Sequence, residues 1–410
     1  MSLPGVPSSG VDVCTVAVFA PMFPPAFLGG GPIRTLDALV RSAPPQFVIR
    51  VLTSDRDLNA KVRLPIPSNR WTTSDGVDVY FASVDQVVRL AQAFFRLRKH
   101  HPEILYYNSF FSAKLSVLPQ FLGLLAFWGS ARRLVAPRGE FGEGALRRRS
   151  LKKRIFMFAY RVAGLHRGVY WHASSEAEAF DIAAVWGETA QILVREDETG
   201  LPAAPLAVVE DAREHPGLRG IFLGRIVEHK GLLILLKGLA EIAAPVRLDV
   251  YGPLEDKSYA EQCRQAATRM PSNVVVTFKG PVRPEDVRST IGAYDVLFMP
   301  TAGENFGHIV AESLSASCPV VCTPFTPWGS VLLGGGGVLV KDRSIDSWAK
   351  ALKDYANLNR EELGSRRISA GLAYSRWWAS AKSPHVLEIF AAGESIASVN
   401  FHKSPERFER

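Results

Sequence analysis

Apolar and polar positions alternate along the chain in a way that predicts strands followed by helices. The first example is the apolar, β-branched run 13–21 (VCTVAVFAP), which predicts a strand. A glycine loop at 29–32 (GGGP) follows, and apolar residues then recur at helical spacing from Ile33 to Val40. A strand, a glycine loop and a helix are the usual start of a doubly wound α/β domain.

The same alternation continues over the first half of the chain. A helix is predicted at 87–99, and further strands are predicted at 47–54, 77–83, 104–109, 134–137 and 169–174. Near-continuous apolar strands that alternate with helices are typical of a parallel sheet covered on both faces. We therefore predict one Rossmann-like α/β domain over residues 1–198.

Polar residues and prolines gather without periodicity between 195 and 216, which indicates a connection between two domains. The alternation then restarts, with strands predicted at 220–223, 248–251, 274–278, 296–300 and 319–322, and helices at 231–242, 258–268, 284–293, 308–316, 345–357 and 360–378. We predict a second doubly wound domain over 199–380. A C-terminal helix and tail over 381–410 could pack back on the first domain. Ligands are expected in a cleft at the carboxyl ends of the strands.

Composition agrees with two globular domains inside a cell. A chain of 410 residues with 47% hydrophobic and 21% charged residues fits two domains of about 200 residues each. The four cysteines are too few for a disulfide scaffold, and Cys318 and Cys322 are predicted to be buried strand thiols rather than metal ligands. The first ten residues lack the pattern of a secretion signal, so a cytoplasmic location is expected.

The stretch 115–131 contains no charged residue, so it could in principle be a membrane-spanning helix. Polar, glycine and proline residues interrupt it, and it falls short of the ~20 apolar residues that a span requires, so we predict a buried helix. The net charge is +8, and much of the excess lies in 132–154. That segment is expected either to meet nucleic acid, anionic lipid or an acidic substrate, or to be a solvated helix face.

The most informative segment is 301–312 (TAGENFGHIVAE), which follows a predicted strand directly. Small residues before a helix start would direct backbone N–H groups and the positive end of the helix dipole at a bound anion. Glu304 and Glu312 lie eight residues apart and could accept hydrogen bonds from the two ends of a nucleotide-sugar. For Glu312, a solvated helix carboxylate is the alternative.

A second segment, 222–231 (FLGRIVEHKG), also runs from a strand through glycine to a helix. Arg225 and Lys230 are two cations at the helix entrance, and they suit a diphosphate leaving group whose negative charge grows as a glycosidic bond breaks. Surface cations are common, so neither residue is specific alone.

Together the two segments resemble family 4 of the retaining glycosyltransferases, which has the GT-B fold. The family pattern is Gly-Arg-x4-Lys-Gly followed by Glu-x7-Glu, here Gly224-Arg225…Lys230-Gly231 and Glu304…Glu312. The resemblance implies that Arg225 and Lys230 hold the donor diphosphate and act with Glu304 in catalysis, and that Glu312 binds the ribose. It further implies donor-sugar contacts from Glu304 with Asn305, Phe306, Gly307 and His308, and loops around Gly252 and Val282 that border the base.

In the first domain, the loop with Gly30, Gly31 and Arg34 resembles the family's first glycine loop, which lies against the donor phosphate and faces the acceptor; a plain turn is the alternative. Segments 107–112, 136–140 and 326–328 resemble a branch that works on bacterial surface polysaccharides such as lipopolysaccharide. Many relatives place a histidine near the donor sugar, whereas 137–140 occupies that loop here. Arg138 or Glu140 would take its role, on the acceptor side. Segments 194–198 and 324–325 also depart from that branch, which leaves acceptor choice and full activity in doubt.

These features predict a retaining hexosyltransferase that needs no metal or other cofactor. It would move a sugar from a nucleotide-sugar to a glycan or lipid-linked acceptor, and could sit peripherally on the inner face of the cell membrane. A GT-B sugar-nucleotide epimerase and an inactive or accessory protein of the same fold are the alternatives. A dehydrogenase that uses Asp55 or Asp57 is disfavoured because the sequence contains no G-x-G-x-x-G, and a P-loop enzyme is disfavoured because it contains no G-x-x-x-x-G-K-[ST]. A nucleic-acid-binding protein would leave the two paired motifs unexplained. The sequence does not identify the donor, the acceptor or the oligomeric state.

Overall fold

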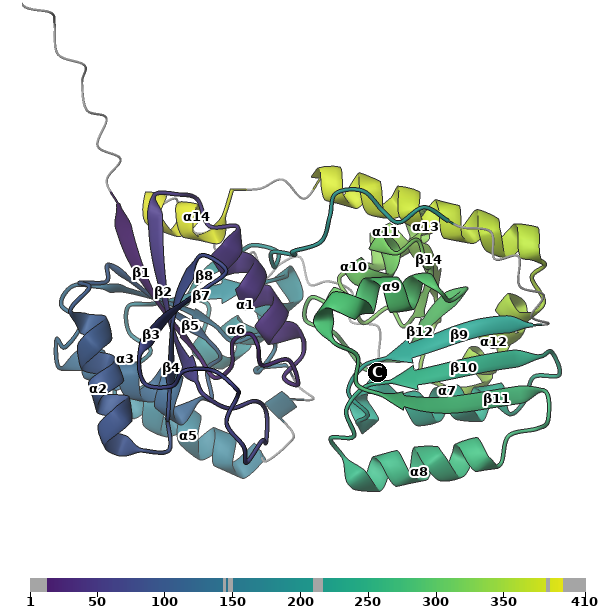
Figure 1. The fold of residues 1–410 in the computed structure, drawn as a ribbon, viewed down its shortest axis with the longest axis horizontal. Coiled ribbons are helices and arrows are strands. Elements are labelled where there is room, and N and C mark those ends of the chain that lie inside the picture. The colour runs from purple at the N-terminus through teal and green to yellow at the C-terminus, as the bar shows by residue number, and fades with distance from the viewer. Residues whose placement is uncertain (1–12, 143–144, 147–149, 209–216, 381–383, 394–410) are drawn as a thin grey trace, which may run out of the picture. The chain divides into compact units, whose positions relative to one another are not determined.

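The computed structural model describes residues 13–142, 145–146, 150–208, 217–380 and 384–393. The chain divides into two compact units: unit 1 comprises residues 1–198 and 384–410, and unit 2 comprises residues 199–383. Each unit contains one twisted sheet with helices packed on it (Figure 1).

The described part of unit 1 has an eight-stranded sheet in the order β3-β4-β2-β1-β5-β6-β7-β8. Among these described strands, only β3 runs antiparallel to its neighbour. The strands are β1 (Cys14–Ala20), β2 (Phe47–Ser54), β3 (Trp71–Ser74), β4 (Val77–Ala82), β5 (Ile104–Asn108), β6 (Arg132–Ala136), β7 (Val169–Ala173) and β8 (Gln191–Val194). Because the central strands are buried on both faces, they are apolar at nearly every position.

Two cores lie on the two faces of this sheet. One is formed with α1 (Gly31–Arg41) and α14 (Val386–Ala392). The other is formed with α2 (Val87–Arg98), η1 (Ala113–Val117), α3 (Leu118–Leu124), α5 (Ser150–Val162) and α6 (Glu176–Trp186). The second core is rich in aromatic rings that gather around the buried Phe110.

Unit 2 has a parallel six-stranded sheet in the order β11-β10-β9-β12-β13-β14 among its described residues. The strands are β9 (Leu218–Leu223), β10 (Val246–Tyr251), β11 (Val274–Gly280), β12 (Val296–Met299), β13 (Val320–Cys322) and β14 (Gly337–Leu339). Its helices are α7 (Leu232–Leu239), α8 (Lys257–Thr268), α9 (Val287–Gly292), α10 (His308–Ser315), α11 (Gly329–Val331), α12 (Ile345–Ala356) and α13 (Arg360–Ser380), with short turns η2 (Glu228–Lys230), η3 (Pro284–Asp286) and η4 (Leu332–Gly336).

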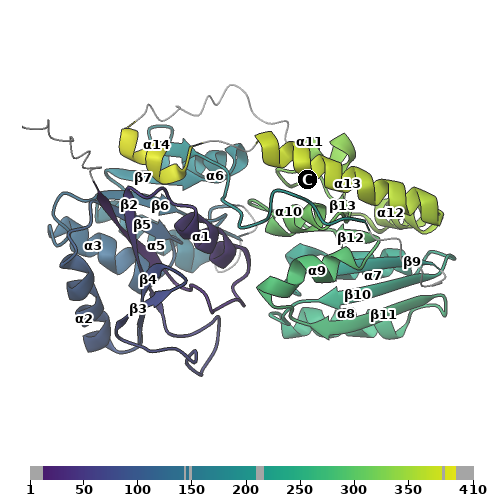
Figure 2. The same cartoon turned by 45° about the horizontal axis from the view of Figure 1, so that its top comes forward.

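The helices of unit 2 also cover both faces of its sheet. Helices α7, α8 and α12 form one core, while α9, α10 and α13 form the other. Figure 2 shows α13 lying along α10 in unit 2. Packing of α13 on α10 matters for the site, because α10 follows the loop that carries Glu304.

The predicted α/β class with two doubly wound sheets is confirmed. The sequence did not predict β3, β8 or β14, which are short. Cys318 and Cys322 are buried thiols, as predicted. Of the predicted C-terminal helix, residues 381–383 lie outside the described residues, and α14 begins at Val386.

The prediction of a buried helix over 115–131 is right only in part. Only 118–124 is α-helical, and the outward side chains Leu118, Phe121 and Leu124 are exposed. Helix α3 packs on the core with one face only. Its other face carries apolar residues where polar ones are usual, so the composition suggested more burial than occurs. In the described part of the chain, no helix is both long and apolar enough to cross a membrane.

Candidate functional site

Two adjacent strands of unit 2 bring the predicted motifs together. Strands β9 and β12 pair in parallel, so their carboxyl ends lie at the same edge of the sheet. Strand β10 flanks β9 on its other side, so the chain changes direction across the sheet between β9 and β12. Open α/β sheets bind ligands at such a switch point, outside the carboxyl ends of the strands.

The element after β9 depends on a glycine for its path. The loop leads through η2 (Glu228–Lys230) to Gly231, whose φ of 76° is in the left-handed region. A Cβ atom at Gly231 would lie 2.1 Å from the Pro300 carbonyl oxygen, so only glycine lets the end of β12 approach this closely. The approach places Lys230 beside the loop that follows β12.

Backbone hydrogen bonds fix the loop between β12 and α10. The Ala302 amide donates to the His229 carbonyl at 2.8 Å, and the Glu304 amide donates to the Phe325 carbonyl at 3.0 Å. Helix α10 then starts at His308 after Gly307, whose φ is 81°, and no side chain caps this N-terminus. The predicted helix start after the small-residue loop is therefore present, and binding of an anion there stays a prediction.

The side chains of Lys230 and Glu304 form an ion pair. Lys230 Nζ donates to Glu304 Oε1 at 2.5 Å, and both side chains are largely buried. Burial alone would raise the pKa of Glu304, but the Lys230 charge and hydrogen bonds from Lys230 and Thr301 outweigh it, so its pKa is lowered. Glu304 is an anion and an acceptor at neutral pH.

Two further ionisable side chains, Arg225 and His229, belong to the same element as Lys230. Arg225 is half exposed and makes an ion pair with Glu255 at 2.8 Å. Burial, together with the charge of Lys230, lowers the pKa of His229 to about 4, so this imidazole is neutral at neutral pH. The site at the β9 and β12 ends thus holds two cations that belong to one predicted motif.

The remaining predicted residues of unit 2 lie on the same strand ends or on α10. Glu312 is buried in the second turn of α10, which agrees with the helix position predicted for it. Gly252 follows β10, and a Cβ atom there would lie 1.8 Å from the Gly224 carbonyl oxygen. Val282 follows β11 and packs against the core beneath α10. Asn305, Phe306, Gly307 and His308 belong to the loop and first turn already described.

Sequence reasoning missed Arg343 as a residue of this site. Its guanidinium donates to the Pro300 carbonyl at 3.1 Å and to the Glu228 carbonyl at 3.2 Å. It therefore ties the end of β12 to the element that carries Lys230. No sequence motif marks this contact, because a carbonyl acceptor leaves no trace in the side chains.

Trp328 was predicted only as a mark of family branch, but it contacts the loop itself. Its indole Nε1 donates to the Phe306 carbonyl, and its ring lies 5.4 Å from the Phe306 ring and 4.7 Å from the Trp377 ring. Trp377 belongs to α13, so these aromatic rings hold the start of α10 against that helix.

In unit 1, the glycine loop leads into α1 as predicted. Gly30 has a φ of 71° and precedes the helix, with Gly31 as its first residue. The Asp57 carboxylate accepts hydrogen bonds from the amides of Phe27 and Leu28 at 3.0 and 3.2 Å, which holds the loop from outside. Asp57 therefore stabilises this loop, whereas in a dehydrogenase the corresponding carboxylate would bind the ribose of the dinucleotide.

Arg34 stands in the first turn of α1. It is largely enclosed by protein, and burial lowers its pKa to about 10. The structure does not test its predicted position on the acceptor side, so that role stays a prediction.

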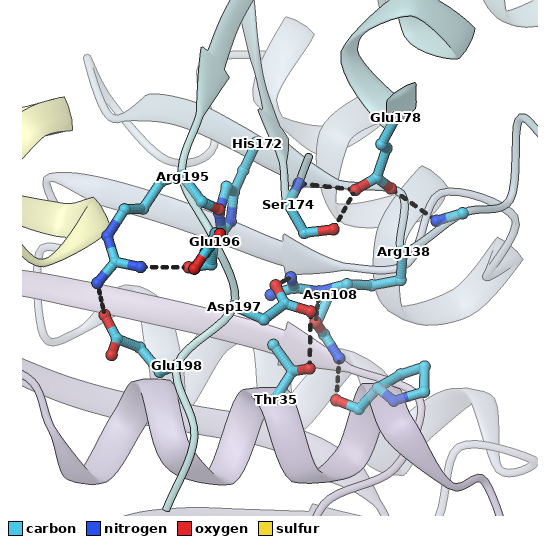
Figure 3. Close-up of polar contacts among 12 residues, drawn as sticks. Thr35, Asn108, Arg138, His172, Ser174, Glu178, Arg195, Glu196, Asp197 and Glu198 are labelled. Atoms are coloured by element: carbon cyan, nitrogen blue, oxygen red, sulfur yellow. Dashed lines mark hydrogen bonds and ion pairs between the residues drawn. The ribbon is translucent and has the colours of Figure 1, made fainter. Parts of the chain in front are cut away.

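Arg138 lies in a buried network at the carboxyl ends of β5, β6 and β7 (Figure 3). Its guanidinium pairs with the Asp197 carboxylate and donates to Asn108 Oδ1 at 2.8 Å and to Tyr106 Oη at 2.6 Å. Asp197 also accepts from Thr35 Oγ1 at 3.0 Å, which fastens the network to α1. Sequence reasoning had assigned Asp197 to a connection between domains.

His172 completes the network beneath Tyr106. Its Nε2 lies 3.0 Å from the Arg195 carbonyl, which only accepts, so Nε2 carries the proton and Nδ1 accepts from Tyr106 Oη at 2.9 Å. Burial and the charge of Arg138 lower the pKa of His172 well below its usual range. This is a neutral histidine in unit 1, but it lies inside the fold.

Glu140 accepts hydrogen bonds within its own unit. Ser109 Oγ donates to Oε1 at 2.7 Å, while the Phe110 and Phe111 amides donate to Oε2. Burial raises the pKa of Glu140, although these hydrogen bonds oppose it. The carboxylate therefore orders the loop after β5, and its predicted role toward an acceptor is not tested.

The sequence of this chain is similar to those of known glycosyltransferases over part of its length. The family model described as "Glycosyl transferases group 1" matches residues 218–357. A D-inositol 3-phosphate glycosyltransferase of Corynebacterium urealyticum is 31% identical over 139 residues, 32% of this chain and 33% of that protein. A phosphatidyl-myo-inositol mannosyltransferase of Mycobacterium tuberculosis is 32% identical over 171 residues, 40% of this chain and 44% of that protein. The chain thus matches less than half the length of these relatives.

Solved structures resemble the chain over most of its length. Anabaena Alr3699/HepE in complex with UDP and glucose superimposes with a TM-score of 0.67 at 14% identity, covering 92% of this chain and 100% of that one. WaaG, a glycosyltransferase involved in lipopolysaccharide biosynthesis, superimposes with a TM-score of 0.58 at 15% identity, covering 93% and 98%. At these identities the likeness shows a shared fold.

Proposed function

We propose, from the premise that this chain is a GT4-like relative of the group 1 glycosyl transferases with the GT-B fold, that it is a retaining hexosyltransferase. Its donor would be a nucleotide-sugar, and its acceptor a glycan or a lipid-linked glycan of bacterial surface polysaccharide synthesis. The neighbour solved with UDP and glucose and the neighbour involved in lipopolysaccharide biosynthesis support these substrate classes.

One observation carries the proposal. The cation Lys230 after β9 and the carboxylate Glu304 after β12 meet at the switch point of the unit 2 sheet, with Arg225 on the same element as Lys230. Two cations suit a diphosphate, and a buried anionic carboxylate suits sugar hydroxyls. The resemblance had implied that both residues contact the donor, but the ion pair between them was not predicted.

In the proposed reaction, the acceptor hydroxyl attacks the anomeric carbon from the face that the nucleoside diphosphate leaves. The bond from the anomeric carbon to the diphosphate oxygen breaks, a bond to the acceptor oxygen forms, and a donor phosphate oxygen takes the acceptor's proton. Arg225 and Lys230 would stabilise the charge that grows on the diphosphate, so no metal is required in the proposal. Configuration at the anomeric carbon is retained.

Glu304 would have two tasks in this scheme. Its carboxylate accepts hydrogen bonds, so it can hold the hydroxyls of the transferred sugar, and it also holds the Lys230 ammonium in place. The Thr301–Gly307 backbone and the start of α10 would contact the sugar and the phosphate. Glu312, deeper in α10, would bind the ribose.

The first test is a binding and hydrolysis screen of the full chain against UDP-, GDP- and ADP-sugars without added metal. An Arg225→Ala/Lys230→Ala variant is measured in parallel, and Arg264→Ala, which changes an exposed arginine of α8, serves as control. One nucleotide-sugar should bind, and the double variant should lose about 10² to 10³ in turnover. A stably folded chain that binds no nucleotide-sugar would contradict the proposal.

Product analysis separates the transferase from its closest alternative. With the donor identified, candidate acceptors are inositol phosphates, inositol lipids and surface glycans, the first two chosen from what the relatives are named for. Nuclear magnetic resonance of the product reports whether the anomeric configuration is kept. An epimerised nucleotide-sugar formed without any acceptor would favour an epimerase instead.

A further inference from the structure

Positive charge is concentrated in one part of unit 1. Residues 86–175 contain 16 lysines and arginines against three acidic residues, a net charge of +13, whereas the whole chain carries +8. The rest of the chain therefore carries a net charge of −5. Helices α2, α3 and α5 all lie in this basic part and pack on the same core, on the sheet face opposite α1 and α14 (Figure 1).

The outward face of α5 is apolar, although it is exposed. Leu151, Ile155, Phe158 and Val162 follow each other at intervals of four, three and four residues, so they form one stripe along the helix. Each is between 60 and 71% exposed. A helix on the surface of a soluble domain normally turns polar residues outward, so this stripe is unusual.

Basic side chains flank the stripe on both sides. At 100° per residue, Lys152 falls on one side of it and Arg154 on the other, and both are exposed. Residues 150–162 contain no acidic side chain. The opposite face of α5 is anchored, because Tyr160 is buried and donates to Gln120 Oε1 of α3.

Helix α3 also carries exposed apolar side chains. Leu118, Phe121, Leu124 and Leu125 are between 38 and 67% exposed. The Tyr160–Gln120 hydrogen bond joins the two helices, and their exposed apolar side chains are here together called the α3–α5 face. The face consists of these four residues and the α5 stripe, with Lys152 and Arg154 beside it.

Three other described arginines of the segment 132–154 do not belong to this face. The Arg132 guanidinium stacks 4.1 Å from the Phe390 ring, and Arg133 donates to the Leu165 and Arg167 carbonyls. Arg138 is buried with Asp197. Fewer basic residues of this segment are therefore available to an anionic partner than the sequence suggested. Arg147, Arg148 and Arg149 lie outside the described residues.

We propose that the α3–α5 face is a docking surface for an anionic lipid bilayer, on which the helices lie without crossing it. An apolar stripe flanked by lysine and arginine matches both the acyl region and the headgroups of such a surface. A second copy of this chain would present the same positive charge and be repelled, and the nucleic acid backbone offers no apolar environment for exposed leucine, isoleucine and valine side chains. The inference does not depend on the transfer reaction.

The test is flotation of the full chain with phosphatidylcholine vesicles and with vesicles that also contain phosphatidylglycerol. The unaltered chain should float with anionic vesicles and much less with neutral ones. Ile155→Asn/Phe158→Ser should bind anionic vesicles at least about tenfold more weakly, because the inserting apolar area is lost. Lys152→Gln/Arg154→Gln should weaken binding by roughly tenfold on anionic vesicles only.

Matched controls lie on unit 2. Ile368→Asn/Leu372→Ser changes two exposed apolar residues of α13, and Lys350→Gln/Lys353→Gln changes two exposed lysines of α12. Both controls should bind as the unaltered chain does. Should the stripe variant unfold, Leu151→Ser/Val162→Ser changes the same stripe at its ends. Absence of vesicle binding, equal binding to both vesicle types, or unchanged binding by the folded stripe variant would overturn the inference, whether or not the chain binds a nucleotide-sugar.

Discussion

Lys230 Nζ lies 2.5 Å from Glu304 Oε1, so the cation predicted to hold a diphosphate and the carboxylate predicted to hold a sugar form one ion pair. Each side chain is largely enclosed by protein, where a lone charge would be costly. The pair therefore keeps both residues charged and in place. A bound donor would have to share Lys230 between its phosphates and Glu304.

Replacing Lys230 should reverse the pKa shift of Glu304. The pKa of this carboxyl is below 4.5 because Lys230 and hydrogen bonds outweigh burial. The pair thus stabilises the fold above pH 4.5 and loses that contribution as the pH falls through the lowered pKa. In Lys230→Met burial remains, so the pKa should rise above 4.5, and the buried anion should cost stability at neutral pH.

Carbon-13 nuclear magnetic resonance of the Glu304 carboxyl measures this pKa directly. Lys237→Met, an exposed lysine of α7, is the control and should leave the Glu304 titration unchanged. A Glu304 pKa that stays below 4.5 in Lys230→Met would mean that the ion pair is not its cause.

Loss of Arg343 should loosen the donor site without removing a predicted donor contact. Arg343→Met deletes hydrogen bonds to the Pro300 and Glu228 carbonyls, each worth about 1.5 to 3 kcal/mol for a charged donor and less where solvent screens it. We expect a lower melting temperature and a rise in the donor KM, with kcat changed less. Arg343→Lys should recover part of the KM, and an unchanged KM in Arg343→Met would refute the positioning role.

The sequence could predict the Arg225–Lys230 element and the Glu304 loop because both stand at strand ends with glycines, and strand ends of a parallel sheet meet at one edge. It could not predict Arg343, whose partners are carbonyl groups with no residue signature. Asp197 was missed for another reason: it follows β8, a four-residue strand that was not predicted, so its segment looked like a linker. The 115–131 error shows that composition alone does not separate a buried helix from one with an exposed apolar face.

Acid should destabilise the fold through His229. Its pKa is lowered from 6.5 to about 4 in the folded chain, so the unfolded chain binds more protons between these pH values. Stability should therefore fall as the pH drops from 6.5 to 4. Melting temperatures of His229→Asn should depend less on pH over this range, whereas His101→Asn, an exposed residue, should keep the unaltered slope. An identical slope in His229→Asn would exclude this histidine as a cause.

Breaking the buried pair Arg138–Asp197 should destabilise the chain strongly. Arg138→Met leaves the Asp197 carboxylate buried without its cation, which typically costs about 3 to 5 kcal/mol. Urea unfolding measures the loss, and Arg138→Met/Asp197→Leu should recover much of it. Asp75→Asn removes the exposed partner of Arg41 and should cost about 1 kcal/mol or less. If Arg138→Met keeps full stability but loses acceptor affinity, the structural role is contradicted and the predicted acceptor role is supported.

Gly231 should tolerate no side chain. Its φ of 76° is unfavourable for alanine, and the added Cβ would lie 2.1 Å from the Pro300 carbonyl oxygen, so β12 and the Lys230 element would have to separate. Gly231→Ala should therefore lower the melting temperature and weaken donor binding together. Gly364→Ala is the matched control: it lies in α13 with no atom near the added Cβ, and alanine there should stabilise the helix by about 0.5 to 1 kcal/mol. Donor binding that survives Gly231→Ala would mean that the close approach at Pro300 does not position Lys230.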